Sequence, residues 1–347
     1  MNRRTGLVIS VITAFFKVDI LRLFISILLL LTAACGVAAL TTRSAKTDEP
    51  QKLKVAATIF PLADWLREIG GPDVEVRCLI AGAANAHHYE PSMQDAVFVS
   101  DAHAIFAVGG GLDPWASKLA ANAASSTRAP FYFDTLNWVA SRPLQSILKI
   151  SMHGIGPVQK CLQGSCDHGH CGHGNTDPHY WLDPRRAITV VERMTAELSR
   201  MDPAHAGDFA RRSNAYIEKL KVLDAEIESA AKGSKKKTLV TFHDAYGYLF
   251  ERLNISLAAV VQSSPGIEPS PRDVSEALRA MREANQQAVF GEPAGGPAAG
   301  LLAREMNVKL QILDPMDTEF SEAGKTYLER MRHNLKILRP DAATVQN

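Results

Sequence analysis

Three of the chain's eleven histidines lie in sequence settings that suit a metal ion. His87 comes shortly after the apolar run Val74 to Ile80, and His179 directly precedes a predicted helix. His243 follows the run Thr238 to Phe242. In open α/β folds, ligands gather outside the carboxyl ends of strands. These three histidines fall at strand ends and in loops, the positions where such ligands bind.

Asp314, which closes the run Leu310 to Leu313, adds a carboxylate in a similar strand-end position. Imidazole nitrogens together with one carboxylate suit Zn²⁺, which accepts nitrogen and oxygen ligands in tetrahedral geometry. A single histidine in such a place is more often structural or solvated. Spacing alone does not show that residues so far apart in the sequence converge, so both interpretations stay open at this level.

A glycine-rich segment at 161–176 has no apolar periodicity and carries a second group of histidines, His168, His170 and His173. We expect a mobile surface loop there. Its cysteines, Cys161, Cys166 and Cys171, do not form the C-x-x-C pairs of a structural zinc site. In an exported protein these cysteines and Cys78 could form disulfides, but the connectivity cannot be deduced.

The elements that must position these residues are short β-rich runs that alternate with helical patterns. Such alternation is typical of βα units around mainly parallel sheets and predicts an α/β fold. The runs are Lys54 to Ile59, Val74 to Ile80, Ala104 to Val108, Leu239 to Phe242, Ala288 to Phe290 and Leu310 to Leu313.

The middle of the chain is the most helical part. One helix is predicted after Asp183-Pro184, with Ile188, Val191, Thr195 and Leu198 on one face. A second begins at Asp202-Pro203, because proline is favoured at the first helical position. Its apolar stripe recurs at spacings of four and three and consists of Phe209, Ser213, Tyr216, Leu220, Leu223 and Ile227. At 1.5 Å per residue this helix would span roughly 40 Å, enough to run along two lobes.

The first 35 residues differ in composition from the rest. Basic residues precede two apolar runs, and small residues precede Cys35. This pattern suits an export signal, and it resembles a bacterial lipoprotein signal in which Cys35 is lipidated. An uncleaved membrane anchor is the alternative, because the two runs together could cross a bilayer of ~30 Å. Either interpretation places the rest of the chain outside the cytoplasm, in the periplasm or at the cell surface.

The chain's length and charge limit the remaining possibilities. Its 347 residues suffice for two lobes of moderate size. The formal net charge of +1 gives no field that would recruit nucleic acid. The expected organisation is an export segment at 1–35, a flexible tether at 36–52, a first α/β lobe at 53–202, a linking helix at 203–231 and a second α/β lobe at 232–347.

Six motifs across residues 53–339 resemble the ABC-transporter solute-binding proteins that carry zinc or manganese. They are Ala57 to Leu62, His87-x-Tyr89-Glu90-Pro91, Gly109-x-Gly111-Leu112-Asp113-x-Trp115, Asp177-Pro178-His179-x-Trp181-Leu182-Asp183-Pro184, Phe242 to Tyr246 and Leu313-Asp314-Pro315. The resemblance implies two α/β lobes with mainly parallel sheets, joined by a single long rigid helix. It also implies that His87, His179, His243 and Asp314 hold one Zn²⁺.

The same resemblance implies a function without catalysis. We expect a monomeric extracytoplasmic receptor that captures Zn²⁺ and delivers it to an ABC-type membrane permease. His243 favours the zinc type, because manganese members usually have a carboxylate at that position. The usual Asp-Pro before the first ligand is replaced by Asn85-Ala86, and His88 could compete with His87.

Two further expectations concern the loop and the alternatives. The loop at 161–176 resembles the His-rich loop of zinc members, which implies that His168, His170 and His173 collect zinc weakly. Glu292 and Glu90 belong to motifs of the family and are expected to have structural or site-supporting roles instead of acting as bases. The alternatives are an exported zinc hydrolase, in which an open position on the metal would activate water, and a manganese receptor of the same family. A secondary role as a surface adhesin also stays open.

Overall fold

The computed structural model describes residues 52–80, 86, 89–123, 129–140, 176–232, 235–262, 268–293, 296–319 and 321–339. They belong to one compact unit, Lys52–Asn347. The expected export segment and all of the expected tether except Lys52 lie outside the described residues, as do Cys35, His87 and His88. The expected loop is outside them too, apart from Thr176.

The first lobe contains a parallel four-stranded sheet in the order β2-β1-β3-β4. Its strands are β1 (Leu53–Ala57), β2 (Val74–Cys78), β3 (Ala104–Ala107) and β4 (Phe131–Asp134). Its helices are α2 (Phe60–Gly70), α3 (Met93–Asp101) and α4 (Pro114–Ala123), with 3₁₀ turns at Gly71–Asp73 and Thr135–Trp138. We define the first lobe by these elements.

The second lobe repeats this topology, with a parallel four-stranded sheet in the order β6-β5-β7-β8. Its strands are β5 (Lys237–Thr241), β6 (Ile255–Val260), β7 (Ala288–Gly291) and β8 (Lys309–Ile312). Its helices are α9 (Gly247–Arg252), α10 (Pro271–Glu283), α11 (Ala298–Met306) and α12 (Tyr327–Leu338). In both sheets the strand order reverses beside the first strand of the lobe, which creates a topological switch point.

Successive side chains of the central strands point to opposite faces of each sheet. In β1, Val55 and Ala57 enter a large inner core, whereas Ala56 joins a smaller outer cluster with residues of α3 and α4. In β5, Leu239 enters the same inner core and Val240 joins an outer cluster with residues of α10 and α11. Each sheet is therefore covered on both faces, as parallel sheets require.

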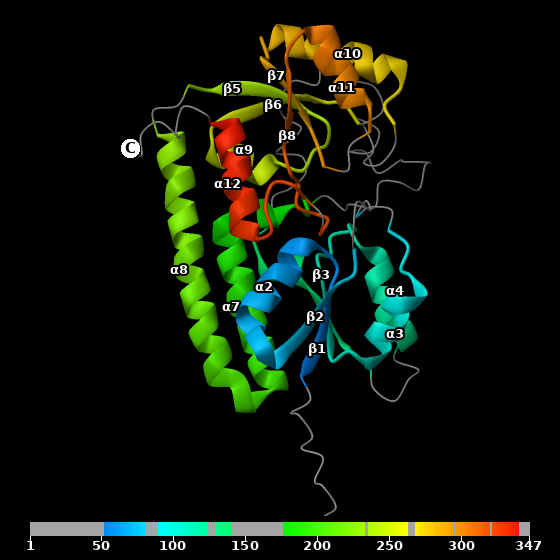
Figure 1. The fold of residues 1–347 in the computed structure, drawn as a ribbon, viewed down its shortest axis with the longest axis vertical. Helices are drawn as coiled ribbons and strands as arrows, with labels where there is room; N and C mark the ends of the chain where they lie inside the picture. Colours follow the sequence, from blue (N-terminus) through cyan, green and yellow to red (C-terminus); the bar gives the residue numbers. More distant parts are fainter. Residues whose placement is uncertain are drawn as a thin grey trace, which may run out of the picture. The chain divides into compact units, whose positions relative to one another are not determined.

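Two long helices connect the lobes. In α7 (Pro184–Met201) the carboxylate of Asp183 accepts a hydrogen bond from the backbone N–H of Arg185, and Pro184 begins the helix. After a 3₁₀ turn at Pro203–His205, α8 (Ala206–Ala231) packs against α2 of the first lobe and against α9 and α12 of the second (Figure 1). The expected fold class, two α/β lobes joined by a long helix, is confirmed.

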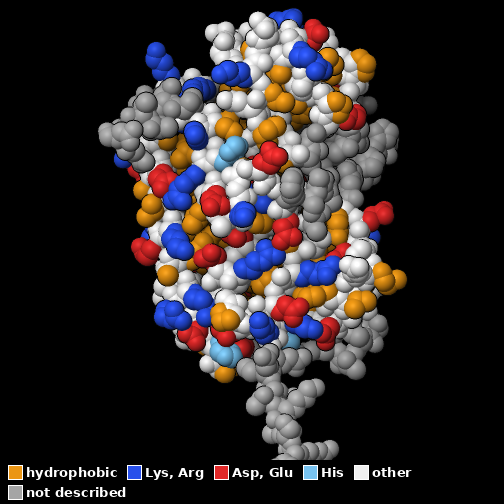
Figure 2. Space-filling view, viewed as in Figure 1, with side chains coloured by type: hydrophobic (Ala, Val, Ile, Leu, Met, Phe, Trp, Pro, Cys, Tyr) orange, Lys and Arg blue, Asp and Glu red, His pale blue; other side chains and the backbone are white. Residues whose placement is uncertain are grey.

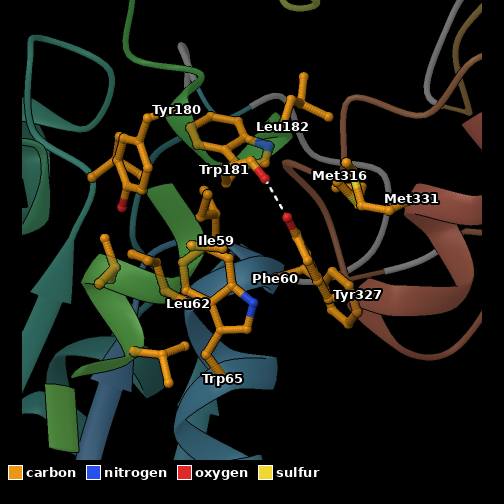
Figure 3. Packing of buried hydrophobic residues seen from close by; sticks show 14 of the residues in the cluster. Ile59, Phe60, Leu62, Trp65, Tyr180, Trp181, Leu182, Met316, Tyr327 and Met331 are labelled. Atoms are coloured by element: carbon orange, nitrogen blue, oxygen red, sulfur yellow. Dashed lines mark hydrogen bonds between the residues drawn. The ribbon is translucent and has the colours of Figure 1, made fainter. Parts of the chain in front are cut away.

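The inner core is continuous between the lobes. Trp65 of α2 contacts Tyr327 of α12 edge to face, with ring centroids 5.2 Å apart. The hydroxyl of Tyr327 donates a hydrogen bond to the carbonyl of Trp181 at 2.7 Å, and Figure 3 shows this bond above Trp65. All three side chains belong to one buried cluster that contains residues of both sheets. The lobes are thus joined through side-chain packing as well as through α8.

The face of the molecule drawn in Figure 2 shows no concentration of one charge among the described residues. Lysine and arginine side chains are interspersed with aspartate and glutamate over the face drawn in Figure 2. Within the described ranges, no helix combines the length and apolar character that a bilayer crossing requires. Cys78, at the end of β2, is a buried free thiol.

Candidate metal site at the lobe junction

His243 lies two residues beyond the end of β5, at the switch point between β5 and β7. Only 4% of its surface is exposed. The hydroxyl of Thr241 donates to the backbone carbonyl of His243 at 2.8 Å, which ties the residue to the end of the strand. The strand-end position expected for His243 is therefore the one observed, and it faces the edge where ligands bind in open α/β sheets.

His179 belongs to a segment between the lobes, residues 176–184, which we call the junction segment. Asp177 accepts from the backbone N–H of His179 at 3.0 Å and lies 2.9 Å from its Nδ1. A carboxylate at Nδ1 fixes the orientation of the imidazole and places the lone pair on Nε2, as is usual for metal-binding histidines. Like His243, His179 is 4% exposed.

The junction segment is held by side chains of the second lobe. Tyr248 of α9 donates to the carbonyl of Asp177 at 2.9 Å, and Arg252 pairs with Asp183 at 3.0 Å. The indole N–H of Trp181 donates to the carbonyl of Pro315 at 2.7 Å. These contacts bring His179 to the second lobe, although it precedes that lobe by more than 50 positions in the sequence.

The two histidines meet across this junction. Their ring centroids are 5.0 Å apart and their planes are nearly perpendicular, at 78°. Two buried imidazoles at this separation can direct nitrogens towards one small cation. Convergence of residues from distant motifs, which spacing could not establish, is thus observed for His179 and His243.

Two carboxylates accompany His243. Glu292, directly after β7, has its Oε1 3.6 Å from Nδ1 of His243, and Tyr246 places its hydroxyl 3.2 Å from the same oxygen. Burial opposes the charged form of His243, but the charges of Glu292 and Asp317 outweigh it, so its pKa is raised. Burial and the charge of Glu292 raise the pKa of Asp317 to about 7, while His243 opposes that shift. The site therefore has a negative potential that favours a cation.

Asp314 has a different environment. One of its oxygens accepts from the backbone N–H of Met316 at 2.7 Å, and the other accepts from the Ser321 hydroxyl at 2.5 Å. Met316 has a φ of 63°, a left-handed conformation. A side chain that accepts from the amide two residues ahead forms an Asx turn, which stabilises such a bend. Asp314 thus shapes the loop after β8, whereas Asp317 interacts electrostatically with His243.

The described residues contain only part of the expected ligand set. His87 lies outside them. Among the residues that are described, no three His, Cys, Asp or Glu side chains form a group suited to a metal ion. His168, His170 and His173 also lie outside the described ranges. Asp317 was missed from the sequence, although a second acid three positions after Asp314 was a visible signal.

A family model places this arrangement among known proteins. Residues 55–340 match the family described as zinc-uptake complex component A, periplasmic. A zinc-binding lipoprotein, AdcA, of Streptococcus pneumoniae is 29% identical over 316 residues, which are 90% of this chain and 60% of that protein. The chain therefore spans about 60% of the length of that relative. The high-affinity zinc uptake system protein ZnuA of Bacillus subtilis is 26% identical over 314 residues, 89% of this chain and 93% of that protein.

Solved structures share the fold. The Zn(II)-bound AdcA structure from Streptococcus pneumoniae aligns with a TM-score of 0.66 at 26% identity, over 84% of this chain and 57% of that one. A laminin-binding protein of Streptococcus agalactiae, described as an adhesin with metal-transporting activity, aligns with a TM-score of 0.67 at 25% identity, over 84% and 99%. Because the family model matches most of its length, the chain belongs to the family of zinc-uptake complex component A, periplasmic.

Proposed function

We propose that this protein is an extracytoplasmic receptor that captures Zn²⁺ and delivers it to an ABC-type membrane permease. The observation that carries the proposal is the pairing of His179 and His243. Both side chains are buried at the junction of the lobes, and their ring centroids are 5.0 Å apart. The family's description and the zinc-binding names of the relatives favour zinc as the cargo. The continuous core between the lobes favours capture with small lobe movements, without a wide hinge closure.

The proposed ligands are His87, His179 and His243 with one carboxylate from the loop after β8. Neutral imidazoles and a carboxylate would replace the water shell of the ion. The sequence favours Asp314 as the carboxylate. Asp317 competes with it, because Asp314 already accepts two hydrogen bonds that shape the loop and Asp317 interacts with His243.

A matched pair of variants separates the two carboxylates. If Asp317 is the ligand, Asp317→Asn should weaken zinc binding at least tenfold, whereas Asp314→Asn should mainly lower the melting temperature of the metal-free protein. Zinc affinity is measured by competition with a chromophoric chelator, and melting by circular dichroism. The reverse pattern, with a larger loss of affinity in Asp314→Asn, would establish the assignment that the sequence favours.

Metal identity depends on His243. Imidazole suits zinc, whereas the harder Mn²⁺ prefers oxygen ligands and a higher coordination number. His243→Glu should therefore weaken zinc binding and narrow the difference in affinity between the two metals. A competition titration of zinc against manganese, on the parent and the variant, provides the test. An unchanged preference would remove His243 from the ligand set and with it the main residue-level argument for zinc.

The alternative of an exported zinc hydrolase requires an open coordination position for water. This chain belongs to a family of zinc-uptake components, and that membership favours the receptor over the hydrolase. The absorption spectrum of the Co²⁺-substituted protein distinguishes the two. A four-ligand site without water supports transport, and an exchangeable water that titrates near neutral pH would support hydrolysis.

The proposal extends to the parts of the chain outside the described residues. We propose lipidation at Cys35, which predicts that Cys35→Ala yields a soluble protein or an unprocessed precursor; a variant that is still lipid-labelled would refute it.

We also propose that the segment at 161–176 collects zinc weakly through His168, His170 and His173. Its deletion should reduce the number of weakly bound ions and spare the tight one, and loss of the tight ion would contradict this role.

A further inference from the structure

A buried arginine connects the first lobe to the loop that bears the carboxylates. We call residues 313–319 and 321–324 the acid loop. Arg330, in the first turn of α12, is only 1% exposed. Its Nε donates to the carbonyl of Gly324 at 2.9 Å and its Nη1 to that of Thr318 at 2.8 Å, while Nη2 donates to the carbonyl of Glu319. All three acceptors belong to the acid loop.

The acid loop lies between β8 and α12, where the described residues form neither a helix nor a strand. Its backbone carbonyls therefore lack the regular hydrogen bonds of such elements. Backbone carbonyls away from water need partners. One planar guanidinium provides partners for carbonyls on both sides of the loop, at 318–319 and at 324. Lysine carries a single ammonium on a flexible stem and cannot reproduce this fork.

The other contact of Arg330 is with the first lobe. Its guanidinium carbon lies 3.6 Å from the ring centroid of Phe60, the first residue of α2. Its Nη1 is also 3.8 Å from Oδ2 of Asp314. The arginine is therefore held between an aromatic face of the first lobe and the backbone of the acid loop.

A second link between α2 and the acid loop is weaker. Arg67 pairs with Glu319 at 2.7 Å, but both side chains are more than a third exposed. An exposed pair contributes little, because water and salt screen it. The buried contact through Arg330 is thus the principal link between α2 and this part of the loop.

We propose that Arg330 is the positioning residue of the metal site: it fixes the acid loop against the first lobe, so that the loop's carboxylate meets the His179–His243 pair. This inference rests on the proposed zinc-binding function. Groups that orient metal ligands typically change affinity by about 10–100-fold when they are replaced. Arg330 touches no metal, and its effect passes through the loop.

The test compares Arg330→Lys with the control Arg332→Lys. Arg332 lies one residue beyond Met331 on the same helix, is 45% exposed and pairs with Glu226. In the full chain, Arg330→Lys should weaken zinc binding by about 10–100-fold and alter the visible spectrum of the Co²⁺-substituted protein. The control should match the parent in both. A folded Arg330→Lys variant with a lower melting temperature but parental affinity and spectrum would overturn the proposal, because the role would then be purely structural.

If Arg330→Lys does not fold, Phe60→Leu tests the same link from the first lobe. It keeps the hydrogen bonds of Arg330 and removes the ring beneath the guanidinium, so zinc affinity should fall several-fold with a smaller spectral change. Parental values of both would overturn the proposal. A parent protein that fails to bind zinc tightly would instead refute the proposed function.

Discussion

The junction segment contains His179 and the acid loop contains Asp317, which interacts with His243, but the two regions are held in different ways. Tyr248, Arg252 and Tyr327 each anchor a different residue of the junction segment. In the acid loop, the carbonyls at 318, 319 and 324 all accept from one side chain, that of Arg330. The junction segment is held by several side chains, each at a different residue, whereas three carbonyls of the acid loop share one donor, Arg330.

The difference shows how the two regions should respond to change. Contacts with no shared partner contribute nearly additively, so the loss of one hydrogen bond in the junction segment should cost only the contribution of that bond. Contacts made by one group are lost together. The part of the acid loop at 318–324 should therefore lose its three bonds together, and we expect this loss to affect the proposed metal binding more than folding.

The largest expected effect comes from removing the centre of the junction segment. Trp181 is fully buried and contacts His179 at a ring-centroid distance of 5.1 Å. Trp181→Ala should reduce the free energy of unfolding by about 3–5 kcal/mol, because it leaves a cavity and removes the hydrogen bond to Pro315. Urea denaturation measures this value. A loss below about 1 kcal/mol, the usual value for one hydrogen bond, would mean that this region repacks easily.

The second effect concerns the contact of α2 with α12 and depends on pH. Asp64 accepts from the backbone N–H of Tyr327, the first residue of α12, at 3.0 Å. Burial raises its pKa to about 6, helped by Glu68 and opposed by that hydrogen bond, Arg67 and Arg330. A raised pKa favours the protonated form in the folded state. The stability from this group is thus complete below about pH 4 and is lost as the pH rises through about 6.

Asp64→Asn isolates that dependence, because the amide oxygen still accepts a hydrogen bond but does not titrate. The free energy of unfolding of the variant, relative to that of the parent, should rise by up to about 3 kcal/mol between pH 4 and pH 7. Denaturation curves at several pH values give the difference. A constant difference across this range would show that folding does not raise the pKa of Asp64.

The smallest effect tests the independence of the junction contacts. Tyr327→Phe removes only the hydroxyl that donates to Trp181 and keeps the ring packed against Trp65. We expect a loss of about 1 kcal/mol in unfolding free energy and zinc affinity within a few-fold of the parent. Tyr248→Phe is the matched variant at the other end of the segment. If either change weakens zinc binding as strongly as Arg330→Lys, the contrast between the two regions disappears.

Much of the fold was predictable from periodicity. All six positions of the apolar stripe from Phe209 to Ile227 are buried in α8. In α7 the prediction was less accurate, since Ile188 and Thr195 are only half-buried and the buried face includes Ala187, Val190 and Met194. Because α7 packs against α8, its buried face includes positions that the predicted stripe did not contain. The buried face of α7 is therefore broader than the predicted stripe.

Two strands were not predicted. β4, with the sequence Phe-Tyr-Phe-Asp, is a short edge strand whose aromatic residues are partly exposed, so it shows no alternation. β6, Ile255–Val260, contains Ser256 and two alanines and fits a helix as well as a strand. Tertiary pairing with β5 decides its conformation. Both cases reflect pairing with a neighbour, which a local pattern does not contain.

The candidate site was also only partly predictable from the sequence. The strand-end position of His243 was predictable because the end of an apolar run is visible in the sequence. The different environments of Asp314 and Asp317 were not, because they depend on the left-handed turn at Met316 and on Arg330. The sequence shows which residues can bind a metal, but the direction of each side chain follows from contacts with distant elements.

The continuous inner core has a consequence for how the protein could be divided. The packing of Trp65 on Tyr327 means that each lobe completes the other's hydrophobic interior. A fragment ending near the start of α8 would expose a large apolar surface, which favours aggregation over independent folding. Co-expressed halves of the chain should instead recover a native structure by associating, because the two sheets share one hydrophobic core.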